Sequence, residues 1–316
     1  MEYLKRYWQS ALGIFLAVFV FTILLIAPPR NFPLGTHVVI ASGTSVSAIA
    51  HDLAETGVVA HPSVLEFLVR ISGSSTRVQA GTYVFATSQS ALTVAYRLLT
   101  GDYGLTPVRI TYPEGVTARD IAKRTTESLP LLSSIDIVTA GKPHEGYLFP
   151  DTYLFLPTAD VETILSAMRK NFDAKIEPLL DDVRASGHSL TDIIIMASLV
   201  EKEVRTTENR KIVAGILWNR LERGIPLQVD AVFGYIFDRE TYSPSFADLE
   251  VDSSYNTYRH KGLPPGPINN PGLDSIEAAL YSTETDYLFY LTDREGGIHF
   301  ATTYAEHQAN ERKYLN

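Results

Sequence analysis

Two glutamates, Glu201 and Glu203, end an apolar segment that reads "DIIIMASLVEKEV" from residue 192 to 204. If this segment is helical, the residues three, four and seven positions before Glu203 are all apolar, so its carboxyl projects from an apolar stripe. Glu201 lies over a different face, which includes Ser198. Burial and the C-terminal end of the helix dipole both disfavour a negative charge here and raise the carboxyl pKa. A general acid that works near neutral pH requires such a carboxyl.

A second interpretation of the same segment is that the helix simply reaches solvent. In that case the two acids would form ion pairs with nearby cations. The available ones are Lys202, Arg205 and Lys211. The spacing alone leaves both interpretations open and slightly favours the exit into solvent, although it places Glu203 and not Glu201 on the Met196, Leu199 and Val200 stripe.

Polar side chains in two later segments could bind a ligand beside such an acid. In "GIPLQVDAVFGY", Gln228 and Asp230 alternate with apolar residues, which predicts a strand with both on one face. The alternative is the exposed face of an edge strand. In "SSYNTYRHKGLPPGPINNPG", Tyr255, Asn256 and Tyr258 precede Pro-rich turns and have no evident core role. Rings pack on pyranose faces and amides bond sugar hydroxyls, which predicts sugar binding; the alternative is a structural loop held by its prolines.

The composition excludes several classes of site. The chain has 316 residues, a net charge of −9 and no cysteine. Its acidic balance argues against a nucleic-acid partner. The lack of cysteine and the scattered histidines argue against a metal site. No Gly-x-Ser-x-Gly, P-loop or dinucleotide-binding motif occurs, so serine acyl transfer, phosphoryl transfer and hydride transfer have no support, and we expect neither cofactor nor metal.

The elements that must position these residues lie in the second part of the chain. Apolar spacing predicts helices over "DVETILSAMRKNFDAKIEPLL", over the segment with Glu203, and over "TENRKIVAGILWNRLERG". Ser189 or Thr191 would cap the second of these helices. "EGYLFPDTYLF", which begins at Glu145, is broken by Pro150 and is typical of a loop or an edge strand. From residue 225 to 316 we expect short strands and loops.

The N-terminal segment predicts a membrane anchor. Residues 11–27 form an uncharged apolar run that would rise about 26 Å as a helix, near the lower limit for a bilayer core. Lys5 and Arg6 precede the run, which predicts a cytoplasmic N-terminus and an extracytoplasmic remainder at the plasma membrane. A cleaved signal peptide is the competing interpretation, although its apolar region is usually shorter.

After a linker at 30–36, the pattern predicts a succession of short strands and helices. Capping residues and apolar spacing predict strand, helix, helix, strand and helix over residues 37–105. Helix ends are expected at Gly57 and Gly101, and a helix start at Pro62. The expected fold class is therefore α+β, with a transmembrane helix in residues 1–29.

These segments together resemble the YceG-like endolytic murein transglycosylases. The resemblance rests on the order and spacing of "AGTYVF", "PEGVT", "EGYLFPDTY", "MASLVEKEV", "VAGILWNRL", "GIPLQVDAVFGY", "YNTYRHKGLPPGPINNPG" and "YLFYLTDREGGIHFATTYAEH". It implies a LysM-like subdomain at 37–105 and a mixed α/β, YceG-like catalytic domain at 106–316. It also implies that Glu203 is the catalytic residue. We expect Glu201 and Lys202 in supporting positions, where Glu201 holds Lys202 or a loop in place.

The resemblance further implies cleavage of the β-1,4 bond between N-acetylmuramic acid and N-acetylglucosamine in peptidoglycan strands, with 1,6-anhydromuramyl ends as products. One carboxyl suffices for such a reaction, because it can protonate the leaving oxygen and then accept the proton of the muramyl O6 hydroxyl. The residues expected to bind substrate are Gln228, Asp230, Tyr255, Asn256, Tyr258, Glu145 and Asn270. The anchor would keep cleavage of nascent strands close to the plasma membrane.

Two further functions stay open from the sequence. One is a muramidase-type hydrolase, for which Asp230 or Glu145 would be the second carboxylate. The other is a non-catalytic peptidoglycan-binding scaffold that tethers cell-wall synthases. A hydrolase would release products one water heavier, and a scaffold would release none.

Overall fold

The computed structural model describes residues 2–72, 78–239 and 243–315, with the backbone alone for residues 2–7 and 9–11. Lys5 and Arg6, on which the predicted orientation of the anchor rests, therefore lie outside the described side chains. The chain forms two compact units. Unit 1 comprises residues up to 107 together with 156–158, and unit 2 comprises 108–155 and 159 onward.

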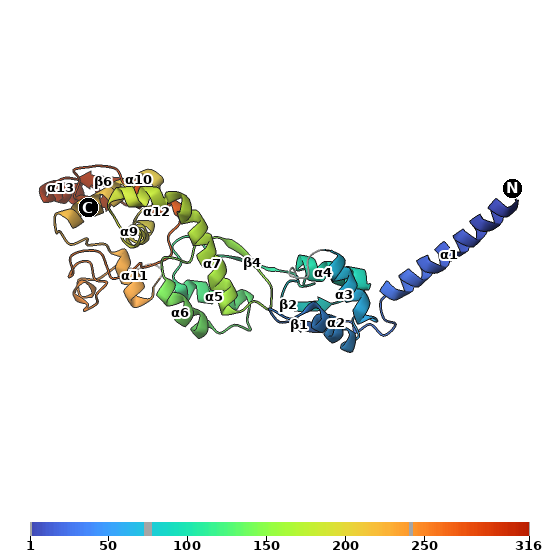
Figure 1. Ribbon diagram of the computed structural model, residues 1–316. Helices are drawn as coiled ribbons and strands as arrows, with labels where there is room; N and C mark the ends of the chain where they lie inside the picture. Colours follow the sequence, from blue (N-terminus) through green and yellow to red (C-terminus); the bar gives the residue numbers. More distant parts are fainter. Residues whose placement is uncertain (1, 73–77, 240–242, 316) are drawn as a thin grey trace. The chain divides into compact units, whose positions relative to one another are not determined.

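Unit 1 contains α1 (Glu2–Ile26), β1 (Thr36–Ile40), α2 (Val46–Glu55), α3 (Pro62–Ile71), β2 (Gly81–Phe85) and α4 (Ala91–Thr100) (Figure 1). The two strands pair antiparallel, and their inward side chains share one core with α2, α3 and α4. Ser45 caps α2, Pro62 opens α3, and Gly101 ends α4 with a φ of 72°. The predicted element order and these helix limits are confirmed. The likeness of this unit to LysM stays a prediction.

Helix α1 exposes many of its apolar side chains. Phe15 and Leu24, for example, are 67% and 64% exposed. Among the residues whose side chains are described, however, no helix combines the length and the apolarity needed to cross a membrane. The membrane anchor at residues 11–27 therefore stays a prediction.

Unit 2 is mostly helical. It contains β3 (Val108–Thr111), α5 (Ala118–Ser128), α6 (Ser134–Gly141), η1 (Lys142–His144), β4 (Thr152–Phe155), α7 (Val161–Ile176), η2 (Glu177–Leu179), α8 (Leu180–Ser186), α9 (Leu190–Glu203), α10 (Thr207–Glu222), α11 (Ala231–Phe237), η3 (Asp248–Glu250), α12 (Leu273–Leu280), β5 (Phe289–Thr292), β6 (Ile298–Ala301) and α13 (Tyr304–Tyr314). Strand β3 pairs antiparallel with β4, and β5 with β6. The mixed α/β class is therefore confirmed in this coarse form.

One prediction for unit 2 was wrong. Residues 225–316 were expected to hold only short strands and loops, but they include α11, α12 and α13. Two of these helices have only seven and eight residues. Helices this short are marginal alone and depend on tertiary packing, so their sequences show little helical periodicity.

Helix α9 forms the centre of the larger core of unit 2. The Ser189 hydroxyl accepts a hydrogen bond from the N–H of Asp192, and the Asp192 carboxylate accepts one from the N–H of Ser189. All eight residues from 193 to 200 are buried, and α10, α11 and α12 pack around them. A core helix capped at Ser189 is thus confirmed, and its last residue is Glu203.

Candidate active site

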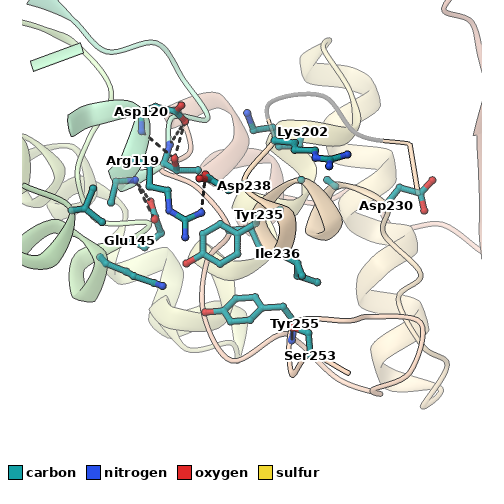
Figure 2. A pocket seen from close by; sticks show the side chains of 18 of the residues that line it. Arg119, Asp120, Glu145, Lys202, Asp230, Tyr235, Ile236, Asp238, Ser253 and Tyr255 are labelled. Carbon is teal, nitrogen blue, oxygen red and sulfur yellow. Dashed lines mark hydrogen bonds and ion pairs between the residues drawn. The ribbon is translucent and has the colours of Figure 1, made fainter. Parts of the chain in front are cut away.

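A cavity of about 760 Å³ opens in unit 2. Its lining comes from the start of α5, the region of η1, the end of α9, and α11 with the loops that follow (Figure 2). Five of the predicted site residues line it, namely Glu145, Lys202, Glu203, Asp230 and Tyr255. The volume lies in the range of pockets that bind small ligands. In the part of the chain that the structure describes, no three acidic or histidine side chains gather in a way that could hold a metal ion.

Glu203 brings its carboxyl to the cavity wall from the end of α9. The Tyr290 hydroxyl on β5 donates a hydrogen bond to Oε2 at 2.9 Å, and the N–H of Ala231 donates to Oε1 at 3.4 Å. Glu203 is half-buried as a residue, and the enclosing protein removes most of the water around its carboxyl and raises its pKa to about 7. The Tyr290 bond opposes this rise and the Asp230 carboxylate adds to it. The predicted upward shift of the Glu203 pKa is confirmed, with burial as its main cause.

Asp230 and Gln228 do not lie on a strand, contrary to the prediction. Asp230 directly precedes α11, and Gln228 adopts a positive φ of 52°, which interrupts an extended backbone. The Asp230 carboxylate lines the cavity and accepts a hydrogen bond from the Tyr258 hydroxyl at 2.6 Å. The Gln228 side chain instead accepts a bond from the buried Arg220. The turn therefore directs only one of the two predicted side chains to the cavity wall.

Glu145 lines the side of the cavity that lies away from Asp230 in Figure 2. It is only 7% exposed and faces the first turn of α5. The N–H of Ala118 donates to both carboxylate oxygens at 3.1 and 3.2 Å, and Asn270 Nδ2 donates to Oε1 at 2.8 Å. Burial nevertheless raises the pKa of Glu145 to about 7. The cavity thus holds two carboxyls that bind protons near neutral pH.

Gly146 allows the loop with Glu145 to pack closely on its neighbours. Its φ is +86°, and a Cβ atom there would lie 2.4 Å from Pro267 Cγ and 2.9 Å from Ile194 Cγ2. Only glycine accepts both the backbone conformation and this approach. The close contact fixes the Glu145 loop against α9, since Ile194 belongs to that helix.

Asn270 and Asn256 are fully buried and hold loops together. The Asn270 side chain donates to the carbonyl of Val116 and accepts from the N–H of Leu148. The Asn256 side chain donates to backbone carbonyls within residues 249–251. Neither asparagine offers an accessible atom to a ligand, so the structure gives no support to the direct substrate contacts predicted for them.

Two tyrosines line the cavity near Glu145. The rings of Tyr235 and Tyr255 have centroids 5.1 Å apart, and both hydroxyls point toward the Glu145 side in Figure 2. Burial raises the pKa of both phenols, and the Glu145 charge adds to this effect. Tyr255 therefore lies in the cavity lining, and its contact with a ligand stays a prediction. Tyr258 is not in the lining and binds Asp230.

Glu201 belongs to a separate network. Arg210 on α10 donates to Oε1 at 2.9 Å, and the N–H of Gly272 before α12 donates to Oε2 at 3.0 Å. Arg210 also pairs with Asp274 at 2.6 Å. Burial raises the pKa of Glu201, and these bonds oppose the rise. Glu201 therefore ties α9 to α10 and α12, while Lys202 is exposed at the cavity wall.

Three groups in the surroundings of Glu203 were not predicted. Tyr290 and the N–H of Ala231 donate hydrogen bonds to its carboxyl, and the charge of Arg220 acts on the Tyr290 phenol. The sequence offers one signal for Tyr290, which is a tyrosine within a short apolar strand, where a buried hydroxyl needs a partner. It gives no signal for that partner, because Glu203 lies 87 positions earlier in the chain.

The sequence model of the YceG-like family matches residues 38–313. The chain belongs to the YceG-like family. An endolytic murein transglycosylase of Bacillus subtilis (strain 168) is 32% identical over 304 residues, which cover 88% of this chain and 84% of that protein. Another, of Streptococcus pneumoniae serotype 2 (strain D39 / NCTC 7466), is 30% identical over 319 residues, which cover 88% of this chain but 58% of that protein.

A solved structure supports the same relation. The crystal structure of a YceG-like protein from Listeria monocytogenes matches this YceG-like chain with a TM-score of 0.60 and 30% identity. The match covers 87% of this chain and 98% of the other. The family resemblance seen in the motifs is thus confirmed, and every cavity residue named above lies inside the matched span.

Proposed function

We propose that this chain is an endolytic murein transglycosylase. It cleaves the β-1,4 bond between N-acetylmuramic acid and N-acetylglucosamine and leaves 1,6-anhydromuramyl ends. The observation that carries the proposal is the Glu203 carboxyl, which lies at a cavity wall with its pKa raised to about 7. The names of the B. subtilis and S. pneumoniae relatives support the same activity.

The reaction needs one carboxyl in two protonation states. Protonated Glu203 donates its proton to the glycosidic oxygen as the bond to the muramyl C1 breaks. The resulting carboxylate then accepts the proton of the muramyl O6 hydroxyl while O6 bonds to C1. A pKa of about 7 suits both steps, because neither protonation state is strongly favoured at neutral pH.

Substrate contacts come from the remaining cavity wall. The Tyr255 ring can pack on a sugar face, and the Asp230 carboxylate can accept a hydrogen bond from a hydroxyl or an acetamido N–H. We assign substrate binding to these two residues. Gln228 and Tyr258 act through their partners Arg220 and Asp230.

A hydrolase is the second candidate function. Asp230 and Glu145 both line the same cavity as Glu203, and a glycoside hydrolase commonly uses two carboxylates. Hydrolysis adds water to C1, so its product is one water heavier than the anhydro sugar. The mass of the released fragments therefore separates the two functions.

We also propose a location for this activity, on the basis of the N-terminal part of the chain. The apolar side chains that α1 exposes over residues 12–24 and the basic residues before them support attachment to the plasma membrane, with cleavage outside it. Unit 1 is proposed as a LysM-like glycan-binding subdomain, on the order of its elements. Cell fractionation tests the attachment. It compares how much of the full chain, and of a variant that lacks residues 1–29, is recovered with the membranes. Cell-wall synthases are proposed partners, which cross-linking in intact cells would identify.

The Glu203→Gln variant tests the activity. Gln keeps the shape of the side chain but cannot cycle a proton, so we expect release of fragments from purified glycan strands to fall by at least about a thousandfold. Mass spectrometry of the products from the unaltered protein should show anhydro ends. Glu222→Gln, at an exposed site on α10, is the control and should be fully active. Anhydro products from Glu203→Gln at the normal rate would refute the assignment.

A further inference from the structure

The two oxygens of the Glu203 carboxyl have unequal hydrogen-bond donors. The Tyr290 hydroxyl is 2.9 Å from Oε2, a good hydrogen-bond length, whereas the Ala231 nitrogen is 3.4 Å from Oε1, where such a bond is weak. A carboxyl oxygen that binds a proton accepts weaker hydrogen bonds from its neighbours than an unprotonated oxygen does. The proton therefore costs least on Oε1, and the strong donor marks Oε2 as the oxygen that stays unprotonated.

We propose that Tyr290, supported by Arg220, is a positioning residue that directs the Glu203 proton to Oε1 and stabilises the carboxylate between the two steps. The inference rests on the proposed function. Tyr290 does not line the cavity, so it acts through Glu203 and not on the substrate.

Arg220 has the surroundings that this role requires. It is 5% exposed on α10, its guanidinium lies 5.5 Å from the centre of the Phe289 ring, and it bonds the Gln228 side chain. Its Nε is buried without a hydrogen-bond partner among the described residues. A buried cation with an unmet donor is costly. Its charge lowers the pKa of the Tyr290 phenol, against the larger effect of burial, and so makes the hydroxyl a stronger donor.

Four charged or titratable groups interact with the Glu203 carboxyl or with the Tyr290 phenol. Asp230 approaches from the start of α11, Tyr258 from the loop after η3, Tyr290 from β5 and Arg220 from α10. Asp230 raises the pKa of Glu203, whereas the Tyr290 bond lowers it. Removal of the Tyr290 hydroxyl alone should therefore raise the Glu203 pKa further.

A titration of Glu203 tests the proposal without any assay of activity. The full chain is labelled with carboxyl-13C glutamate, and the Glu203 signal is identified by its loss in Glu203→Gln. We expect Tyr290→Phe to raise the Glu203 pKa by about one unit, as a charge-assisted hydrogen bond predicts. Tyr287→Phe, just before β5, should leave it unchanged, since its ring stacks on Phe300 and lies outside this network. An unchanged pKa in Tyr290→Phe overturns the proposal.

The Arg220 contribution is tested in the same titration. Arg220→Met should shift the Glu203 pKa upward by less than Tyr290→Phe does, because the charge acts through the phenol. Thermal unfolding shows whether each variant is folded. If Arg220→Met raises the pKa as much as Tyr290→Phe, Arg220 acts on Glu203 directly, and the supporting role assigned to it is wrong.

Enzyme kinetics test the effect of Tyr290 on the reaction itself. Tyr290→Phe should lower kcat about ten- to a hundredfold and move the alkaline limb of kcat/KM to higher pH. A structural defect alone would lower the rate but leave the limb in place, which would refute the proposal. If the unaltered protein released no fragments, the proposed function would be wrong. The titration would still show whether Tyr290 controls the pKa of Glu203.

Discussion

Glu201 and Glu203 stand two positions apart, yet their surroundings give their carboxyls different tasks. Arg210 and the N–H of Gly272 bind the Glu201 oxygens, which leaves them no room for a substrate. Glu203 faces the cavity and accepts its hydrogen bonds from neutral donors. A fixed ion pair suits a joint between helices, and a carboxyl with neutral donors suits proton transfer.

The variant Glu201→Gln should show this difference. Loss of its charge leaves the buried Arg210 with one carboxylate partner, so we expect the free energy of unfolding to fall by about 1–3 kcal/mol. Urea unfolding measures the change. The folded variant should keep the alkaline limb of its kcat/KM profile, because Glu203 is untouched. A displaced limb would show that Glu201 takes part in the proton transfer.

Glu145 should make the stability of the chain depend on pH. Its pKa is about 7 in the folded chain and about 4.5 when unfolded, so the folded state binds more protons between these values. Its contribution to stability is therefore complete below about pH 4.5 and is lost as the pH rises through 7. Glu145→Gln should reduce this loss by about 1–3 kcal/mol, measured by urea unfolding at pH 5 and pH 7.5. An equal loss of unfolding free energy between pH 5 and pH 7.5 in both proteins would contradict the raised pKa of Glu145.

At the scale of elements, Ser198 joins α9 to the loop before α12. Its hydroxyl is fully buried, donates to the carbonyl of Ile195 at 2.7 Å and accepts from the N–H of Ile268 at 3.1 Å. The Ser198 carbonyl also accepts from the side chain of Asn269 at 2.7 Å. The helix that carries Glu203 is thus fixed to one of the loops that border the cavity.

Ser198→Ala should remove the two hydrogen bonds of the Ser198 hydroxyl. The N–H of Ile268 then has no partner in a buried site, so we expect a loss of about 1–3 kcal/mol of unfolding free energy. Chemical denaturation followed by circular dichroism gives the value. Ser134→Ala, at an exposed position on α6, is the matched control and should change stability by less than about 0.5 kcal/mol. Equal stability of the two variants would mean that the joint contributes little.

The sequence predicted those elements whose signals are local. The Ser189 cap, the apolar run after it and the position of Glu203 at the helix end all lie within fifteen residues. The strand predicted at Gln228 was wrong because a positive φ at a glutamine has no sequence signature. Tyr290 and Arg220 could not be found, since their roles arise from contacts between β5, α10 and α9 that only the folded chain creates.

At the scale of the whole molecule, the two units have separate cores. Leu53 is fully buried in the core of unit 1, and Leu217 is fully buried in the larger core of unit 2. The cavity is lined by residues of unit 2. We therefore expect a substitution in the core of one unit to destabilise that unit and to leave the stability of the other unit unchanged.

Tryptophan fluorescence can test this separation. The chain has two tryptophans, Trp8 and Trp218, so Trp8→Phe leaves Trp218 as a reporter of unit 2. In that background Leu217→Ala should destabilise the Trp218 transition by about 2–5 kcal/mol, and Leu53→Ala should leave it in place. A shift of the Trp218 transition by Leu53→Ala would show that the units unfold as one.

Gly146 limits how this cavity can diversify during evolution. Any larger residue would collide with Pro267 and Ile194 and would strain the backbone at φ +86°. A saturation library at this position should therefore retain only glycine among active clones. New substrate preferences can arise by exchange of the side chains that line the cavity, such as Tyr255, while the loop that carries Glu145 keeps its distance from α9.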